Sequence, residues 1–161
     1  MTNREFFLAR REAEYPTTFK VLEALPADQL DFRLHPRGRS ARELATHIIY
    51  GDVIGAELAV NHRIDYQEPP PAASHQELLT FADKANNDLC AELAKLSEED
   101  WQRKATFRAG KKEFPVVLGE FLWFIHFGLI HHRGQLSTYL RPMGGKVPAI
   151  YGPSADEPGG L

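Results

Sequence analysis

Histidine is the residue type in this chain best suited to chemistry, because a neutral imidazole can bind a metal or accept a proton near neutral pH. The chain has seven histidines, and three of them lie in one short stretch with helical character. Residues three or four apart share a helix face, so His132 falls on the apolar face of Leu129 and Leu136. His126 and His131 are rotated from it by about 120° and about 100°. We therefore expect only His132 to point into the core, and the three histidines not to converge.

His47 is the second histidine of interest, because its helical neighbours Leu44, Ile48 and Gly51 form an apolar stripe. Two readings stay open. His47 is either a core histidine with satisfied ring nitrogens or a metal ligand that meets His132 in the core of a bundle. Neutral imidazoles suit zinc, nickel or iron, but two ligands are too few for a tight site. The sequence offers no obvious third ligand.

Helix caps mark the elements that must position these histidines. Ser40 is followed three residues later by Glu43, and Ser74 by Glu77, the spacing of a capping box. Apolar or small residues recur at helical spacing after each of these serines. A similar pair, Ser97 and Asp100, predicts a short turn of helix. Two long helices and one short one therefore have well-marked starts.

The remaining segments complete a bundle. A first helix is predicted from about residue 3 to 25, with Pro16 expected to kink or divide it, and a last helix from Val116 to Arg141. Gly110 separates two short mixed runs that predict a small hairpin. The expected fold class is all-α. One domain over residues 1–161 forms a four-helix bundle, with a short irregular or hairpin insertion between the third and fourth helices. Residues 142–161, rich in proline and glycine, form an extended tail.

Composition narrows the function classes. Hydrophobic residues make up 43% of the 161 residues and charged residues 25%, which excludes disorder throughout the chain. A net charge of −3 argues against a general nucleic-acid surface. The most apolar run, residues 114–130, is interrupted by Glu120, His126 and two glycines, so it is a poor membrane span. Cys90 is the only cysteine and no export signal is evident, so we expect a cytoplasmic protein without disulfides.

Two segments carry a resemblance to a known family. The run HHRGQLSTYLRPMGG at 131–145, with the ATHI segment around His47 and the Arg-Ser turn before it, resembles the DinB/YfiT-like superfamily. The resemblance implies an up-down-down-up four-helix bundle that is often dimeric. It also implies a divalent metal held by three histidines, one on the second helix and two as HxxxH on the last. Relatives in this superfamily include thiol S-transferases that use bacillithiol and a mycothiol-dependent maleylpyruvate isomerase.

The family pattern maps onto this chain with one departure. His47 matches the ligand on the second helix and His132 the second ligand of HxxxH, but the first HxxxH position is Gly128. His126 can replace that ligand only if the helix carries a bulge. We also expect Tyr50, Arg133 and Gln135 to be substrate-contacting or supporting residues, with simple packing, pairing or capping as the alternative. These three lie at or near the two motif segments.

Two hypotheses about function follow. The first is a divalent-metal-dependent enzyme (zinc, nickel or iron) that acts on a small molecule as a thiol S-transferase or hydrolase, with a low-molecular-weight thiol as cosubstrate. The second is a metal-free bundle that serves as a stress-related binding or interaction protein, which Gly128 favours. We further expect a homodimer, because aromatic residues surround the last predicted helix. No nucleic-acid or membrane partner is expected.

Overall fold

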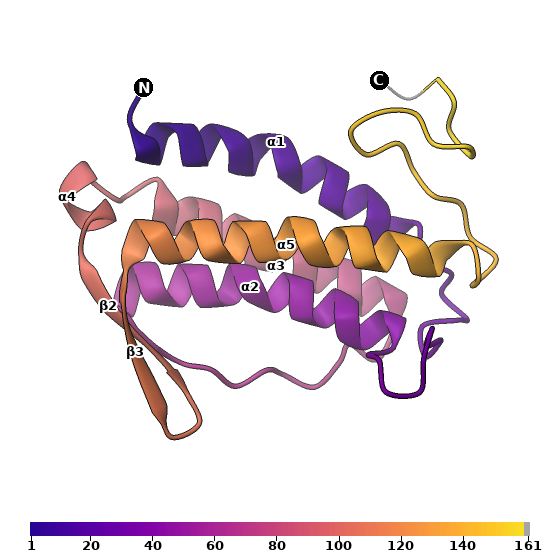
Figure 1. The fold of residues 1–161 in the computed structure, drawn as a ribbon, viewed down its shortest axis with the longest axis horizontal. Coiled ribbons are helices and arrows are strands. Elements are labelled where there is room, and N and C mark those ends of the chain that lie inside the picture. Colours follow the sequence, from indigo (N-terminus) through magenta and orange to yellow (C-terminus); the bar gives the residue numbers. More distant parts are fainter. Residues whose placement is uncertain (160–161) are drawn as a thin grey trace.

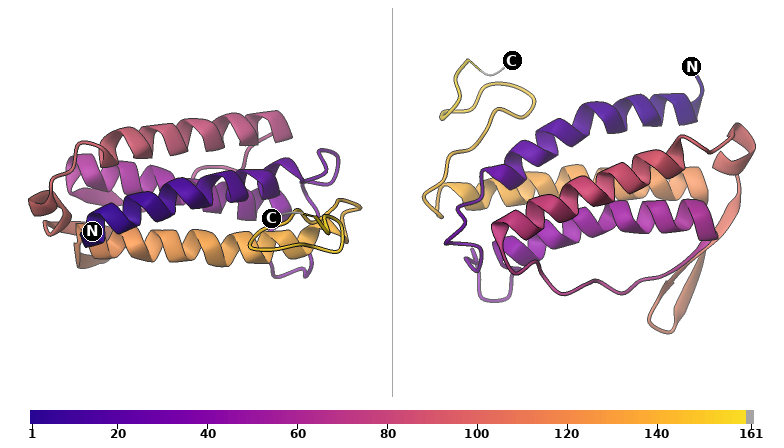
Figure 2. Two further views of the ribbon diagram at one scale, coloured as in Figure 1. Left: turned by 90° about the horizontal axis from the view of Figure 1, so that it is seen from above. Right: turned by 180° about the vertical axis from the view of Figure 1, so that it is seen from behind.

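The computed structural model describes residues 1–159. Its four long helices are α1 (Asn3–Glu23), α2 (Ala41–Asn61), α3 (His75–Leu93) and α5 (Leu118–Leu140). They lie side by side, with α1 and α5 running in one direction and α2 and α3 in the other (Figures 1 and 2). Helix α2 packs against both α3 and α5, and α1 packs against the same two helices. The predicted up-down-down-up bundle is confirmed.

The predicted caps explain where α2 and α3 begin. The Ser40 hydroxyl accepts a hydrogen bond from the Glu43 backbone, and the Glu43 carboxylate accepts one from the Ser40 backbone at 2.7 Å. This is the complete capping box that the sequence predicts. Ser74 also caps α3, but the Glu77 carboxylate accepts from the backbone of Ala73, at 2.8 Å, instead of from Ser74.

Pro16 bends α1 without dividing it. The helix is continuous from Asn3 to Glu23, and its second half is inclined to its first half in Figure 1. Proline removes one backbone donor from a helix interior, so a continuous helix requires compensation from packing. Phe7 before the proline and Leu22 after it are both buried in the core. Apolar burial on both sides therefore keeps the two halves in one helix.

A small sheet stands at one end of the bundle. Strands β2 (Lys104–Ala109) and β3 (Lys112–Val117) form the predicted hairpin, and Gly110 takes the positive φ of 59° that its turn requires. A third strand, β1 (Arg63–Asp65), pairs in parallel with β2 and was not predicted from the sequence. The short helix α4 (Glu98–Trp101) precedes the hairpin. The architecture is thus a bundle with a short extra helix and a three-stranded sheet.

The connection between α2 and α3 has to return along the bundle, because these two helices run in the same direction. After β1 it passes along α2 without regular structure until Ser74 (Figure 1). Residues 142–159 at the other end contain neither helix nor strand, and an ion pair of Arg141 with Asp156 at 3.0 Å holds them to α5. Within residues 1–159, none of the helices combines the length and the apolarity needed to cross a bilayer.

Candidate histidine site between α2 and α5

His47 on α2 and His132 on α5 meet where these helices face each other. Their ring centroids are 4.8 Å apart, and the rings are tilted by 75° in an edge-to-face arrangement. Both side chains are partly buried. The structure therefore brings together the two residues that the sequence analysis proposed as partners, although 85 positions separate them in the chain.

A partly buried network of hydrogen bonds around Glu68 fixes the His47 ring. Its Nδ1 lies 3.2 Å from a carboxylate oxygen of Glu68, and the same oxygen accepts hydrogen bonds from the Tyr66 hydroxyl at 2.7 Å and Arg39 Nη2 at 3.1 Å. Burial alone raises the pKa of Glu68, but the hydrogen bonds from Arg39 and Tyr66 outweigh it and hold that pKa below its usual range. An ionised carboxylate can only accept, so Nδ1 of His47 carries the proton.

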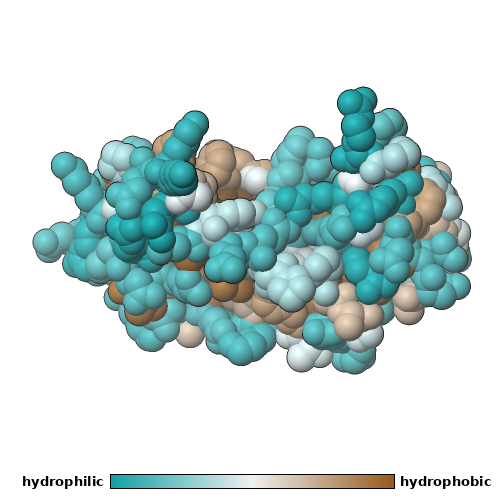
Figure 3. Space-filling model, turned by 90° about the horizontal axis from the view of Figure 1, so that it is seen from below, coloured by the Kyte–Doolittle hydropathy of each residue, from teal (hydrophilic) through white to brown (hydrophobic). Residues whose placement is uncertain are grey.

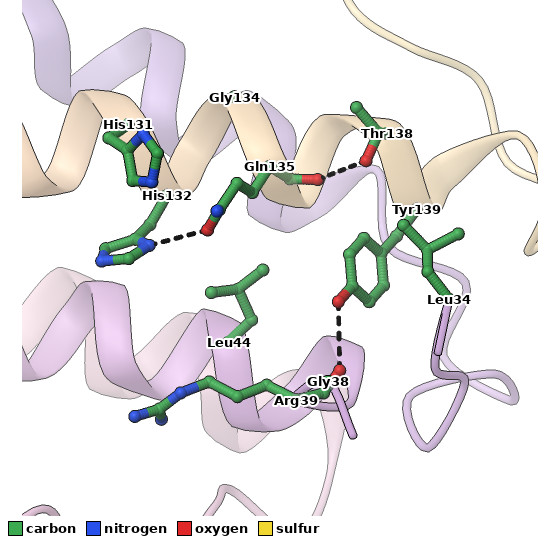
Figure 4. A pocket seen from close by; sticks show the side chains of 10 residues that line it. All are labelled: Leu34, Gly38, Arg39, Leu44, His131, His132, Gly134, Gln135, Thr138 and Tyr139. Atoms are coloured by element: carbon green, nitrogen blue, oxygen red, sulfur yellow. Dashed lines mark hydrogen bonds between the residues drawn. The ribbon is translucent and has the colours of Figure 1, made fainter. Parts of the chain in front are cut away.

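His132 is held in the same tautomer by a different acceptor. Its Nδ1 lies 2.8 Å from the side-chain oxygen of Gln135, one turn further along α5 (Figure 4). An amide oxygen only accepts, so this ring nitrogen also carries the proton. Neither Nε2 atom has a hydrogen-bond partner within the part of the chain that the structure describes. The site therefore presents two imidazole lone pairs.

A cavity of about 230 Å³ lies beside the two rings. Most of its lining is aliphatic or aromatic, from Ile48, Ile54, Phe107, Phe121 and Phe124 among others, and Tyr50 and Tyr66 add two hydroxyls. Gly128 also lines it, and a Cβ atom placed there would meet no heavy atom within 4 Å. The position where the family pattern has a histidine thus opens into the cavity.

A groove of about 610 Å³ lies on the other side of His132. Figure 4 shows its lining, with Arg39, which precedes α2, on one wall and His131, His132 and Gln135 of α5 on the other. The ring of His131 lies 4.9 Å from that of His132 and belongs to the exposed groove surface. His132 therefore stands between an apolar cavity and a more polar groove.

The residues present agree with a divalent metal in donor type but not in number. Each imidazole donates its Nδ1 proton to an acceptor, the outer arrangement that metal-bound histidines commonly have. No group of three His, Cys, Asp or Glu side chains within residues 1–159 is placed to hold a metal ion. Glu68 is engaged by Arg39 and Tyr66. The chain therefore offers two protein ligands where a catalytic zinc site has three.

His126 cannot supply the missing ligand. Helix α5 is continuous, without a bulge, and His126 is only 3% exposed, in contact with the rings of Phe7 and Trp123 on the α1 side. The expectation that only His132 points inward is wrong here. Helix α5 is packed on two sides, by α2 and by α1, so a histidine on either face can be buried.

The other predicted residues divide between the site and its surroundings. Tyr50 lines the cavity, and its hydroxyl accepts a hydrogen bond from the Gln67 backbone at 3.1 Å. Gln135 orients His132. Arg133 is 1% exposed on another side of α5, where it donates to the Glu14 carboxylate at 2.6 Å and to the Tyr151 hydroxyl at 2.6 Å. Arg133 thus ties the C-terminal segment to α1 and does not line the cavity.

Three residues of the site, Arg39, Tyr66 and Glu68, were not predicted as site residues from the sequence. Tyr66 and Glu68 are two residues apart in an extended segment, which puts their side chains on one side of the chain. That spacing is a signal present in the sequence. Nothing in the sequence, however, places this segment beside His47, because the pairing of β1 with β2 sets its path.

Comparisons with known proteins agree with this fold. The sequence profile of the DinB family matches residues 1–159. The chain is 24% identical over 155 residues to Bacillus subtilis YrdA, an uncharacterised protein, covering 95% of this chain and 90% of that one. A DinB-like protein of Bacillus cereus superposes with a TM-score of 0.76 at 23% identity, covering 91% of this chain and 97% of its own. The DinB-like protein YjoA of Bacillus subtilis superposes with a TM-score of 0.71 at 20% identity, covering 89% of this chain and 96% of its own. The chain therefore belongs to the DinB family.

Proposed function

We propose that this protein is an enzyme that acts on a small molecule as a thiol S-transferase or hydrolase, with His47 and His132 as its reacting centre. One observation carries the proposal. The two rings lie 4.8 Å apart, and each has its Nδ1 proton bound to an acceptor, so the Nε2 lone pairs of two neighbouring rings are left free. The cavity beside them suits an apolar substrate body, and the more polar groove suits a water-soluble cosubstrate such as a low-molecular-weight thiol.

The residues of the chain can activate a thiol or a water molecule by proton transfer. Nε2 of His47 takes the proton from S–H or O–H, and the Glu68 carboxylate at Nδ1 stabilises the resulting imidazolium. The thiolate or hydroxide then attacks the electrophilic substrate, and the imidazolium returns the proton to the leaving group. Burial first, and then the charge of Arg39, lower the pKa of His47 below its usual value, so the ring is neutral and ready as a base at pH 7.

We also propose that a metal can assist this reaction, bound to the Nε2 atoms of His47 and His132. Zinc, nickel or iron bound there would lower the pKa of a coordinated thiol or water. Because the described residues supply two ligands and not three, the proposed proton transfer uses His47 and Glu68 rather than a metal.

An activity assay with thiols and electrophilic substrates tests the proposal. The tag-free protein is assayed with a panel of low-molecular-weight thiols and small apolar electrophiles, once with a chelator and once with added zinc, nickel or iron. We expect His47→Ala to lower the rate by about 10²- to 10⁴-fold, the usual contribution of a general base. His35→Ala, an exposed histidine that lines neither the cavity nor the groove, is the matched control and should retain activity. Equal rates for His47→Ala and the control would contradict the proposal.

A second candidate is a metal-free binding protein, and the open cavity at Gly128 favours it. Here the cavity holds a small apolar ligand and no bond is made or broken. The substitution Gly128→His separates the two candidates. If zinc binds only to that variant and ligands bind the natural protein without turnover, the binding function holds. Turnover, or full metal occupancy in the natural protein, excludes it.

A further inference from the structure

A polar layer crosses the bundle on the side of α5 that faces α1. Each long helix contributes one side chain to it, namely Arg11 from α1, Asp52 from α2, Asn86 from α3 and His126 from α5. All four are at least nine-tenths buried, with 3%, 5%, 9% and 3% of their surfaces exposed. Buried polar side chains are normally paired in full, so each donor and acceptor in this layer needs a partner.

The direct hydrogen bonds leave part of the layer without partners. Arg11 donates through Nη2 to the Asp52 carboxylate and, at 2.8 Å, to the Asn86 side-chain oxygen. Its Nε and Nη1 and the Nδ1 of His126 are buried without a hydrogen-bond partner among residues 1–159. A buried polar atom left in this way costs about 1–3 kcal/mol. The three atoms belong to two side chains, Arg11 and His126, that border the same part of the core.

A small void lies where these groups meet. It measures about 10 Å³ and is bounded by Arg11, Asp52 and His126 together with Gly55 of α2 and apolar side chains of α1, α3 and α5. A space of about this size is the smallest that admits one water molecule, and a buried water needs about two to four polar partners. The void is at this lower limit of size, and Arg11 and His126, which carry the unpartnered atoms, are among the residues that line it.

We propose that this void is a binding site for one water molecule that completes the polar layer. The positive charge of Arg11 disfavours a cation there, and the negative charge of Asp52 disfavours an anion. The site therefore suits a small neutral molecule that both donates and accepts hydrogen bonds. The water accepts from Arg11 and shares a hydrogen bond with Nδ1 of His126. This site goes beyond the proposed function, because the histidine pair lies on another face of α5. Ile125 and Leu129 line both the void and the cavity, so the water also supports the wall of the cavity.

A crystal structure of the full chain, at a resolution that shows ordered waters, tests the site directly. The expected result is one density peak at hydrogen-bonding distance, about 2.7–3.2 Å, from Arg11 and from Nδ1 of His126. An empty void, or a direct bond between Arg11 and His126, would overturn the proposal.

Water ¹⁷O relaxation dispersion provides a second measurement in solution. It counts long-lived buried waters, and we expect His126→Leu to have one fewer than the natural protein, because leucine offers the water no partner. His131→Leu, on the exposed side of the same helix, is the matched control and should keep the natural count. An unchanged count in His126→Leu would also overturn the proposal.

Discussion

At the scale of single residues, the tautomers of His47 and His132 decide what the site can do. Each ring has its Nδ1 proton on a fixed acceptor, a carboxylate for His47 and an amide oxygen for His132. Burial and the carboxylate of Glu68 raise the pKa of Tyr66 to about 12, so its hydroxyl stays protonated and keeps donating to Glu68. Hydrogen bonds from Tyr66 and His47 therefore converge on the Glu68 carboxylate and fix it beside the base.

Glu68→Gln tests the role of this carboxylate. The amide keeps the shape of Glu68 but cannot stabilise an imidazolium, so we expect the rate to fall by roughly 10- to 100-fold. The Glu68 charge raises the pKa of His47, so the low-pH limb of the rate profile should also move to lower pH. Glu113→Gln, which removes an exposed ion pair with Arg63, is the control. Identical pH profiles for Glu68→Gln and the natural protein would contradict this role.

His126 predicts how stability depends on pH. Burial first, and then the charge of Arg11, lower the pKa of His126 to about 4 from a usual value near 6.5. The unfolded chain therefore binds a proton at this residue between about pH 6.5 and pH 4, and the folded chain does not. The free energy of unfolding should fall on acidification through that range, by up to about 1.4 kcal/mol per pH unit from this residue. Urea unfolding of the natural protein and His126→Leu measures it, and equal slopes would contradict it.

At the scale of elements, the junction between α4 and α5 depends on one glycine. A Cβ atom on Gly119 would lie 2.2 Å from Nε1 of Trp101, a side chain that is 2% exposed. The Trp101 indole itself donates to the Asn3 side chain at 2.9 Å, which joins α4 to the start of α1. Three helices thus meet at a position that admits no side chain.

Gly119→Ala should therefore destabilise the protein by about 1–3 kcal/mol, the usual cost of overpacking a core. Gly134→Ala is the matched control on the same helix, where an added Cβ would meet no heavy atom within 4 Å. Because alanine favours a helix over glycine, the control should be stabilised by about 0.5–1 kcal/mol. Urea unfolding measures both, and a Gly119→Ala protein as stable as the control would contradict the packing account.

The helices and strands also differ in how far they, and the site between them, could be predicted from the sequence. Local signals, such as the Ser40 cap and the apolar spacing around His47, were enough to predict α2 and to suggest the meeting of His47 with His132 as one of two interpretations. The environment of His47 was not predictable, because Glu68 reaches it through the pairing of β1 with β2 across 43 positions at Arg63 and Thr106. The burial of His126 depends in the same way on α1, which covers it from the far end of the sequence.

At the scale of the whole molecule, the surface combines a largely hydrophilic face with exposed aromatic residues. In Figure 3 apolar residues are interspersed among hydrophilic ones on the face that is seen from below. On α5, Phe124 is 68% exposed and Phe127 60% exposed, and Phe127 stacks on Trp123. Large exposed aromatic side chains close together often mark an interface.

We predict that the protein is a homodimer that uses this face of α5. Light scattering at micromolar concentration should give twice the 18.2 kDa mass of one chain. Phe124→Ser with Phe127→Ser should shift the mass toward one chain, whereas Leu34→Ser, an exposed apolar residue elsewhere, should not. A monomeric mass for the natural protein at that concentration would contradict the prediction.

The central claim is that His47 and His132 form one centre with two free Nε2 atoms. Long-range ¹H–¹⁵N NMR of the histidine rings, in tag-free protein titrated with zinc as a probe, tests it most directly. The account predicts Nδ1–H tautomers for both rings before titration, and zinc shifts both Nε2 signals together. Nε2–H tautomers, or a zinc response confined to one of the two rings, would contradict it.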